Sequence, residues 1–224
     1  MSTPKENKWA KPLGFVIIIF AIIGVVFLVM NIVSAITAKV DKSDEKLLTY
    51  QQMLVPVVMN DIDAFDDVTK ANMSQLVEAS IWAIIKSDID TDTYENDGEN
   101  LLFPAADVEA QFIKLFGTDV AIEHQTIETS AFEIEYDAEK QVYKVPITGA
   151  DAVYTPKVLD MTKKSNTVIL TVALLSAGNW TQDDYGNMVE PEPSKYVKIT
   201  LREKDKSYYI SAIAPTNAPE TLSK

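Results

Sequence analysis

The residues best spaced for metal chemistry lie in one acidic stretch, residues 88–99. A twelve-residue calcium-binding loop places oxygen ligands at positions 1, 3, 5, 9 and 12. Those positions are occupied here by Asp88, Asp90, Asp92, Asn96 and Glu99. Two positions depart from the pattern, because Thr93 stands where a glycine turn is needed and Glu95 where an apolar residue is usual. Calcium therefore competes with two other interpretations, a solvated acidic loop and a small hairpin that turns at 96–98.

The single histidine, His124, is the second candidate for chemistry. Histidine is the side chain whose unperturbed pKa lies near neutrality, so a general acid or base could be assembled from His124 with Asp119 or Glu123. The alternative is an ordinary polar residue between a helix and a sheet. The chain also lacks the GxxxxGK[ST], GxGxxG, GxSxG and HExxH motifs, which weakens an enzymatic interpretation.

A third group lies in the long connection 176–195, which we expect to be too long for a hairpin. It combines carboxylates with aromatic rings at Trp180, Asp183, Asp184 and Tyr185. Loops of this composition contact ligands or protein partners, although they also serve as plain exposed turns. We therefore take these residues as a candidate loop for a ligand or partner.

The longest apolar stretch is Leu13–Ala38, which contains no ionisable side chain. As a helix it would be ~39 Å long, enough to cross a ~30 Å hydrocarbon core. The stretch predicts a transmembrane helix that acts as a single-pass signal anchor. Because Val33 and Ala35 match the small residues that signal peptidase accepts, cleavage after Ala35 and secretion is the alternative.

Small residues and one amide recur along this stretch at helical spacing. They are Gly14, Ala21, Gly24, Asn31 and Ala35. Such a stripe lets two helices approach closely in lipid, and Asn31 would supply a hydrogen bond between them. The stripe predicts a contact with a second copy or a partner helix, against the alternative that such residues are simply common in membrane helices.

The orientation of the anchor follows from the charges beside it. The flanking lysines are tied at three on each side, and they are Lys5, Lys8, Lys11, Lys39, Lys42 and Lys46. The free amino terminus and the acidic C-terminal part break the tie. We expect a cytoplasmic N-terminus and an extracytoplasmic domain at the cell membrane, with a cytoplasmic domain as the alternative.

The composition excludes some classes of partner and of chemical site. The chain has 20 Lys and Arg against 33 Asp and Glu, a formal net charge of −13, and no cysteine. Such an acidic protein repels nucleic acid and anionic headgroups, so we expect no nucleic-acid partner. The absence of cysteine excludes disulfides, thiolate metal sites and a cysteine nucleophile.

Hydrophobic periodicity divides the rest of the chain into helices followed by strands. The expected domains are a cytoplasmic tail at 1–12, the anchor at 13–38, a connector at 39–46, a domain at 47–214 and a flexible tail at 215–224. Helices are expected over 47–60, 69–87 and 104–117. Strands are expected over 132–136, 142–147, 156–163, 167–175, 196–202 and 207–214. The predicted fold class is α+β, with an N-terminal transmembrane helix and then about three helices on one curved, mostly antiparallel sheet of about six strands.

This order of elements over Leu47–Ala214 resembles the nuclear transport factor two-like and cystatin-like α+β folds. The segments KPLGFVIIIFAIIGVVFLV, VPVVMNDIDAFDD, LFGTDV, YKVPITG and YTPKV are also similar to a group of uncharacterised single-pass bacterial envelope proteins. These resemblances imply a cone-shaped domain at the cell envelope and bring no activity or catalytic residue. The function expected is a membrane-anchored, extracytoplasmic, non-enzymatic binding module, against an enzyme that uses a pocket in the cone.

Overall fold

The computed structural model of the chain describes residues 45–87, 89–129, 131–147 and 151–219. The chain divides into two units, Met1–Lys46 and Leu47–Lys224, and the fold below is that of the second unit. The anchor expected over 13–38, its contact stripe and the cleavage after Ala35 lie outside the described residues. Among the residues that are described, no helix is long and apolar enough to cross a membrane.

The expected fold class is wrong. The described part is a sheet-rich α+β fold with ten strands in three antiparallel sheets, not three helices on one six-stranded sheet behind a transmembrane helix. The description as a single-pass membrane protein is corrected with it, because the described helices include none that could span a bilayer. The location of the domain depends on residues 13–38 and stays a prediction, as does the resemblance to the cone-shaped folds.

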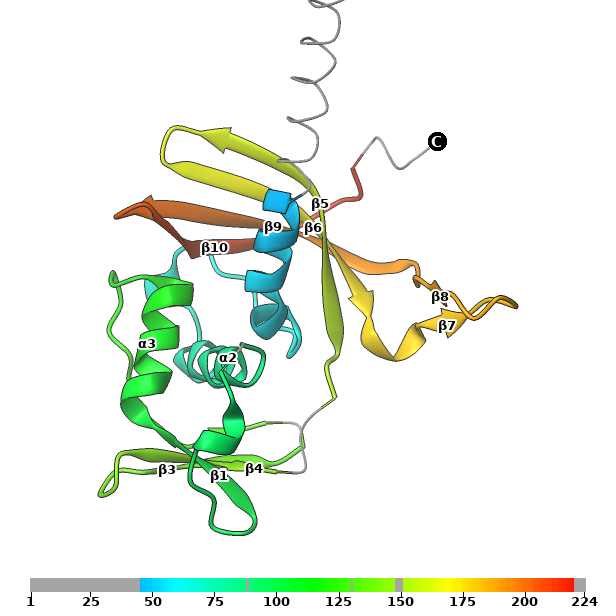
Figure 1. Cartoon of the computed structure of the whole chain (residues 1–224). Coiled ribbons are helices and arrows are strands. Elements are labelled where there is room, and N and C mark those ends of the chain that lie inside the picture. The colour runs from blue at the N-terminus through cyan, green and yellow to red at the C-terminus, as the bar shows by residue number, and fades with distance from the viewer. Residues whose placement is uncertain (1–44, 88, 130, 148–150, 220–224) are drawn as a thin grey trace, which may run out of the picture. The chain divides into compact units, whose positions relative to one another are not determined.

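Four long strands form the first sheet, called here the long sheet (Figure 1). Their order is β10 (Ser207–Thr216), β9 (Pro193–Lys204), β6 (Thr167–Ser176) and β5 (Tyr154–Lys164), all antiparallel. The apolar residues on both faces of β6 predict a central strand, and β6 does lie between β5 and β9. Alternate residues such as Val168, Leu170 and Val172 are fully buried in one core.

Four shorter strands form the second sheet, the short sheet. Their order is β1 (Asn100–Pro104), β4 (Val142–Pro146), β3 (Glu133–Asp137) and β2 (Ile127–Glu128). The expected hairpin of β3 and β4 is present, but it pairs with β1 instead of joining the long sheet. Phe103, Ile134 and Tyr143 have no exposed surface and form a second core with α2 and α3.

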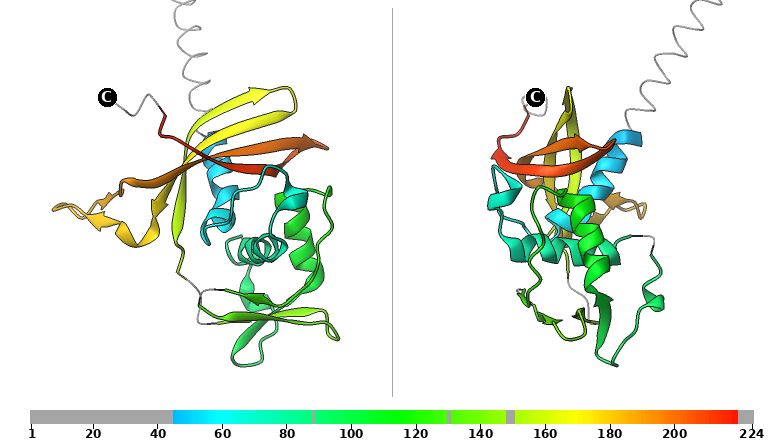
Figure 2. Two further views of the ribbon diagram at one scale, coloured as in Figure 1. Left: turned by 180° about the vertical axis from the view of Figure 1, so that it is seen from behind. Right: turned by 90° about the vertical axis from the view of Figure 1, so that its left-hand side faces the viewer.

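The helices form a layer between the two sheets (Figures 1 and 2). They are a helix over 45–58, α2 (Met73–Ile85) and α3 (Ala105–Phe116), with 3-10 turns η1 (Val68–Lys70), η2 (Thr91–Thr93) and η3 (Ala177–Asn179) in the connections. Helix α2 faces both cores: Leu76, Ala79 and Ala83 pack toward the long sheet, and Val77, Ile81 and Ile84 toward the short one. Because α2 is apolar on two faces, one helix supports two sheets.

Local capping sets where the helices begin and end. Asp67 caps η1 by accepting the N–H of Thr69 at 2.9 Å, and Asn72 caps α2 by accepting the N–H of Ser74. Helix α3 ends at Gly117 with φ +78°, where an added Cβ would lie 2.7 Å from the ring of Tyr209. This close approach positions β10 against α3 and needs glycine.

Candidate functional site

The third sheet is a two-stranded hairpin that stands away from both cores, and residues 181–190 are named here the arm. Strand β7 (Thr181–Gln182) pairs with β8 (Met188–Val189) in antiparallel register. The arm is inserted between β6 and β9, which pair directly with each other in the long sheet. Figures 1 and 2 show it extending beyond the end of that sheet in opposite views. The connection 176–195 therefore contains a hairpin, although we expected it to be too long for one.

The turn at the tip of the arm is fixed by one aspartate. The Asp183 carboxylate accepts the backbone N–H groups of Tyr185 at 2.9 Å and Asn187 at 2.8 Å, and the side-chain amide of Asn187 at 2.9 Å. Gly186 completes the turn with φ +83° and donates its N–H to the carbonyl of Asp183. Hydrogen bonds from Asn187, first from its side chain, hold the pKa of Asp183 below its usual range. The tip therefore has a defined conformation although solvent surrounds it.

The arm exposes three large apolar or aromatic side chains. Tyr185 at the tip is 90% exposed, and Met188 and Val189 on β8 are 58% and 43% exposed. Every residue from 181 to 190 is exposed. Because successive strand residues point to opposite faces, Met188 and Val189 place apolar surface on both sides of the arm, and exposed apolar surface is typical of partner contacts.

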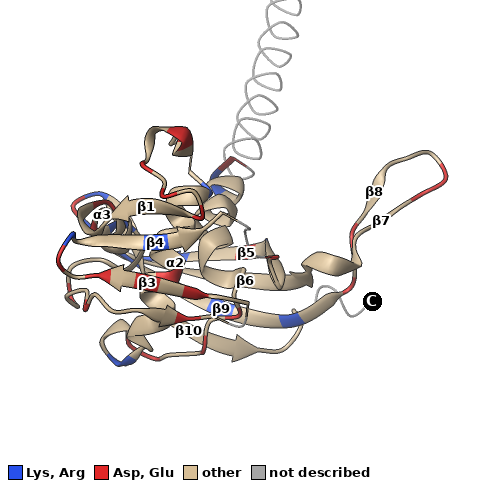
Figure 3. Ribbon diagram, turned by 90° about the horizontal axis from the view of Figure 1, so that it is seen from below, with Lys and Arg blue, Asp and Glu red and all other residues tan. Residues whose placement is uncertain are grey.

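The arm is acidic and attached at its base. Four acidic residues and no Lys or Arg occur over 181–192: Asp183, Asp184, Glu190 and Glu192. Figure 3 shows acidic residues at the end of the arm. The Lys157 ammonium on β5 donates to the Glu190 carboxylate at 2.6 Å and ties the arm to the edge of the long sheet.

The structure gathers part of the predicted partner loop. Asp183, Asp184 and Tyr185 lie together in the turn of the arm, whereas Trp180 lies half-buried at its base, after η3. The sequence analysis missed Met188 and Val189, which share the arm with Tyr185. The signal that could have found them is the Asp-Asp-Tyr-Gly-Asn run, which is typical of a tight turn with a strand on each side.

A wide groove lies at the other end of β9. It has a volume of about 1290 Å³ and is bounded by the helix over 45–58, α3, the end of α2 and the β9–β10 turn. We name it the helix groove. Its apolar lining includes Met53, Pro56, Ala83 and Leu115, with the rings of Tyr50 and Tyr208 packed edge to face at 6.1 Å. Burial, and then the neighbouring Tyr208, raise the pKa of Tyr50, so the phenol is neutral at physiological pH.

The charge of the helix groove is opposite to that of the whole chain. Its charged lining residues are three lysines, Lys86, Lys114 and Lys204, and one aspartate, Asp205. The Lys204 ammonium is held by the Thr118 hydroxyl and by Asp119 at 3.4 Å. Lys86 and Lys114 have no ion-pair partner among the described residues. The groove thus offers apolar and aromatic surface beside two lysines that no described residue pairs with.

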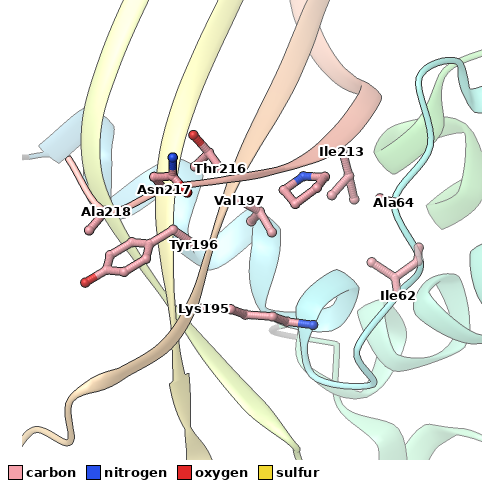
Figure 4. Close-up of a pocket in the computed structure, with 10 residues that line it drawn as sticks. Ile62, Ala64, Lys195, Tyr196, Val197, Ile213, Thr216, Asn217 and Ala218 are labelled. Atoms are coloured by element: carbon pink, nitrogen blue, oxygen red, sulfur yellow. The ribbon is translucent and has the colours of Figure 1, made fainter.

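A smaller hollow of about 360 Å³ lies between the chain near Ile62 and strands β9 and β10 (Figure 4). Its one charged lining residue, Lys195, pairs with Asp61 and lies 4.9 Å from the centre of the Tyr154 ring. This cation is already engaged, and the rest of the lining is uncharged, with apolar side chains beside Tyr196, Thr216 and Asn217.

The described part of the acidic stretch, residues 89–99, contains η2 and the turn before β1. Asp90 caps η2 by accepting the N–H of Asp92 at 3.1 Å, and Asn96 forms a β-bridge with Leu101. A small hairpin is therefore present, with its turn at 97–100 instead of the expected 96–98. Within the described ranges, no group of three or more His, Asp or Glu is placed to hold a metal ion, and Asp88 is not described. Asp90, Asp92, Asn96 and Glu99 follow the strand-and-turn geometry without gathering into such a group.

His124 lies beside two tyrosines. Its Nδ1 is 2.9 Å from the Tyr143 hydroxyl, and its ring stacks on Tyr136 at 5.1 Å. The Gln125 backbone N–H donates to the same hydroxyl, and burial raises the pKa of Tyr143 far above the physiological range. The phenol of Tyr143 stays neutral, and the direction of its hydrogen bond with Nδ1 depends on the histidine tautomer. This arrangement links the segment before β2 to the short sheet.

The proposed carboxylate partners of His124 are engaged or exposed. Asp119 accepts the Tyr209 hydroxyl at 2.7 Å, and this bond, ahead of the Lys204 bond, lowers the pKa of Asp119. Glu123 is exposed. In the part of the chain that is described, no carboxylate bonds to His124. The structure does not assemble the predicted acid–base pair.

Comparisons with models of protein families, with curated proteins and with solved structures found no match.

Proposed function

We propose that residues 47–216 form a non-enzymatic binding module that contacts a protein partner through the arm. The observation that carries the proposal is the exposed Tyr185 on a turn whose conformation is fixed by Asp183. Tyrosine is enriched among the residues that dominate binding energy, and a preformed turn loses little conformational entropy on binding. The partner surface would be apolar, to cover Met188 and Val189, and cationic, to match the acidic flank of the arm.

If the arm were only a solvated turn, we would expect it to have a different composition. A turn with no binding role gains nothing from 90% exposure of a tyrosine ring together with two exposed aliphatic neighbours. The β3–β4 turn of the same domain offers the contrast, because its residues 138–140 are Ala, Glu and Lys. That turn serves as the internal control for the experiment.

The test places a photo-crosslinking phenylalanine analogue at position 185, and in a matched variant at Glu139, in cells that produce the full chain. We expect irradiation to give discrete crosslinked products from position 185 and none of comparable yield from position 139. Equal or absent crosslinking at the two positions would contradict the proposed function.

A further inference from the structure

We propose that the arm of one molecule binds in the helix groove of a second copy of the same chain. This inference rests on the proposed function and names the partner of the arm. The observation behind it is a match between two surfaces that lie at opposite ends of one strand, β9.

The chemistry of the two surfaces is complementary. The arm presents Tyr185 with aliphatic neighbours and carries only acidic charges, and Asp184 beside the tyrosine forms no ion pair with any described residue. The helix groove presents aromatic and aliphatic surface with Lys86 and Lys114 unpaired in the described part of the chain. In a chain of net charge −13, this cationic lining is a local exception. Insertion of the arm would bury the tyrosine and bring Asp184 toward these lysines.

The arm cannot reach the groove of its own molecule. The base of the arm adjoins Pro193 and the groove adjoins Lys204, the two ends of β9. The eleven steps between these residues span ~36 Å at about 3.3 Å per residue, whereas the four steps of the half-hairpin from Thr181 to Tyr185 reach only ~13 Å. Figure 2 shows the arm and the β9–β10 turn at opposite ends of the long sheet. Only a second molecule can supply an arm to the groove.

The association is head to tail. Each copy that lends its arm keeps its own groove free, and each copy that accepts an arm keeps its own arm free. Such a heterologous contact continues into a chain of molecules or closes into a ring. Because the net charges of the copies repel each other, the contact must be held locally by the apolar insertion and the lysines.

The first experiment measures the mass of the purified full chain, 24.9 kDa as a monomer, by sedimentation over concentrations up to about 1 mM. We expect species larger than the monomer whose proportion rises with concentration. Tyr185→Ala, and separately the double variant Lys86→Glu with Lys114→Glu, should each weaken association about tenfold or more. The double variant Lys140→Glu with Lys164→Glu, two exposed lysines outside the groove and the arm, is the matched charge control and should leave association unchanged.

Mixing the two defective variants provides the decisive result. Tyr185→Ala keeps an intact groove and the double lysine variant keeps an intact arm, so together they can form one good contact. We expect the mixture to give a one-to-one dimer that grows no further, at concentrations at which each variant alone is still monomeric. A mixture that stays monomeric, or a wild-type chain that is monomeric throughout, would overturn the proposal.

The crosslinking experiment separates this inference from the proposed function. Products from position 185 that join two copies, with the crosslinked peptide from α3 or from the helix over 45–58, support both. Products that join the arm to a different protein keep the proposed function and overturn self-association. No specific product from position 185 overturns both.

Discussion

Two acidic turns of this domain share the same hydrogen-bonding pattern, but they differ in whether the tyrosine beside them is packed or exposed. In the turn before β1, Asp97 accepts the backbone N–H groups of Glu99 and Asn100 at 3.0 and 2.8 Å, and Gly98 has φ +98°. In the arm, Asp183 and Gly186 do the same for the β7–β8 turn. The turn chemistry alone therefore cannot tell a structural turn from a binding turn.

The tyrosine near each turn makes the difference. Tyr94 packs edge to face on the buried Phe103 with ring centres 4.8 Å apart, and its hydroxyl donates to Asp107 of α3 at 3.0 Å. Tyr185 contacts no such ring among the described residues and is 90% exposed. The ring of Tyr94 contributes to the fold, whereas the ring of Tyr185 is exposed and, in our proposal, contacts a partner. The comparison predicts that changes in the first turn act on stability and those in the second on association.

Replacing the tyrosines should show the largest contrast. Tyr94→Ala removes the packing on Phe103 and the hydrogen bond to Asp107, so it should lower the free energy of unfolding by about 2 kcal/mol. Tyr185→Ala removes no such contact, so its effect on stability should stay within about 0.5 kcal/mol. Urea unfolding of the two variants beside the wild type checks this. A loss of stability from Tyr185→Ala equal to that from Tyr94→Ala would contradict the comparison.

Replacing the glycines should give a smaller contrast of the same kind. Gly98 and Gly186 both have positive φ with no atom within 4 Å of an added Cβ, so alanine introduces backbone strain without a clash. Gly98→Ala should cost about 1 kcal/mol of global stability. Gly186→Ala should leave the unfolding transition in place and loosen only the arm. Thermal unfolding gives the first quantity, and amide exchange at Asn187 the second; a shifted transition in Gly186→Ala would show that the arm is coupled to the cores.

Acidification should loosen both turns, and its effect should be smaller than that of the tyrosine or glycine replacements. Backbone hydrogen bonds from Glu99 and Asn100 lower the pKa of Asp97, and hydrogen bonds from Asn187 lower that of Asp183. A carboxyl group whose pKa is lowered by folding stabilises the folded turn above its unfolded pKa of about 3.9, and this contribution is lost as the pH falls through the folded pKa.

We therefore expect the amides of Asn100 and Asn187 to lose protection between about pH 4 and pH 2. Only the loss at Asn100 should be accompanied by a lower midpoint of unfolding. Asp97→Asn and Asp183→Asn should each flatten the pH dependence of their own turn. Protection that does not change across this interval would contradict the assigned role of the carboxylates.

The sequence predicts the individual strands better than their assembly. Period-two alternation locates β3, β4, β5, β6, β9 and β10, because one face of each strand is buried. That alternation says which face is buried but not which sheet a strand joins, and the hairpin of β3 and β4 pairs with β1 in a separate sheet. The clue to two sheets lies in α2, whose apolar residues cover two faces instead of one.

Some residues of the candidate site can likewise be predicted from the sequence, and others cannot. Asp183, Asp184 and Tyr185 can be selected from the sequence because a turn gathers neighbours in the chain. Strands β7 and β8 have two residues each, too few for alternation to be visible. Lys86, Lys114 and Lys204 come from three distant elements, so only the tertiary structure brings them to one groove.

The central claim is that the arm is covered by a partner when the protein is in its cell. Because the chain has no cysteine, Gln182→Cys on the arm and Glu139→Cys on the β3–β4 turn each provide a single thiol at an exposed position. The measurement is the rate of maleimide labelling in cells relative to the rate in dilute purified protein. Labelling at position 182 should slow by about tenfold more than labelling at position 139 if a contact buries the arm. Equal slowing at the two positions would contradict the claim.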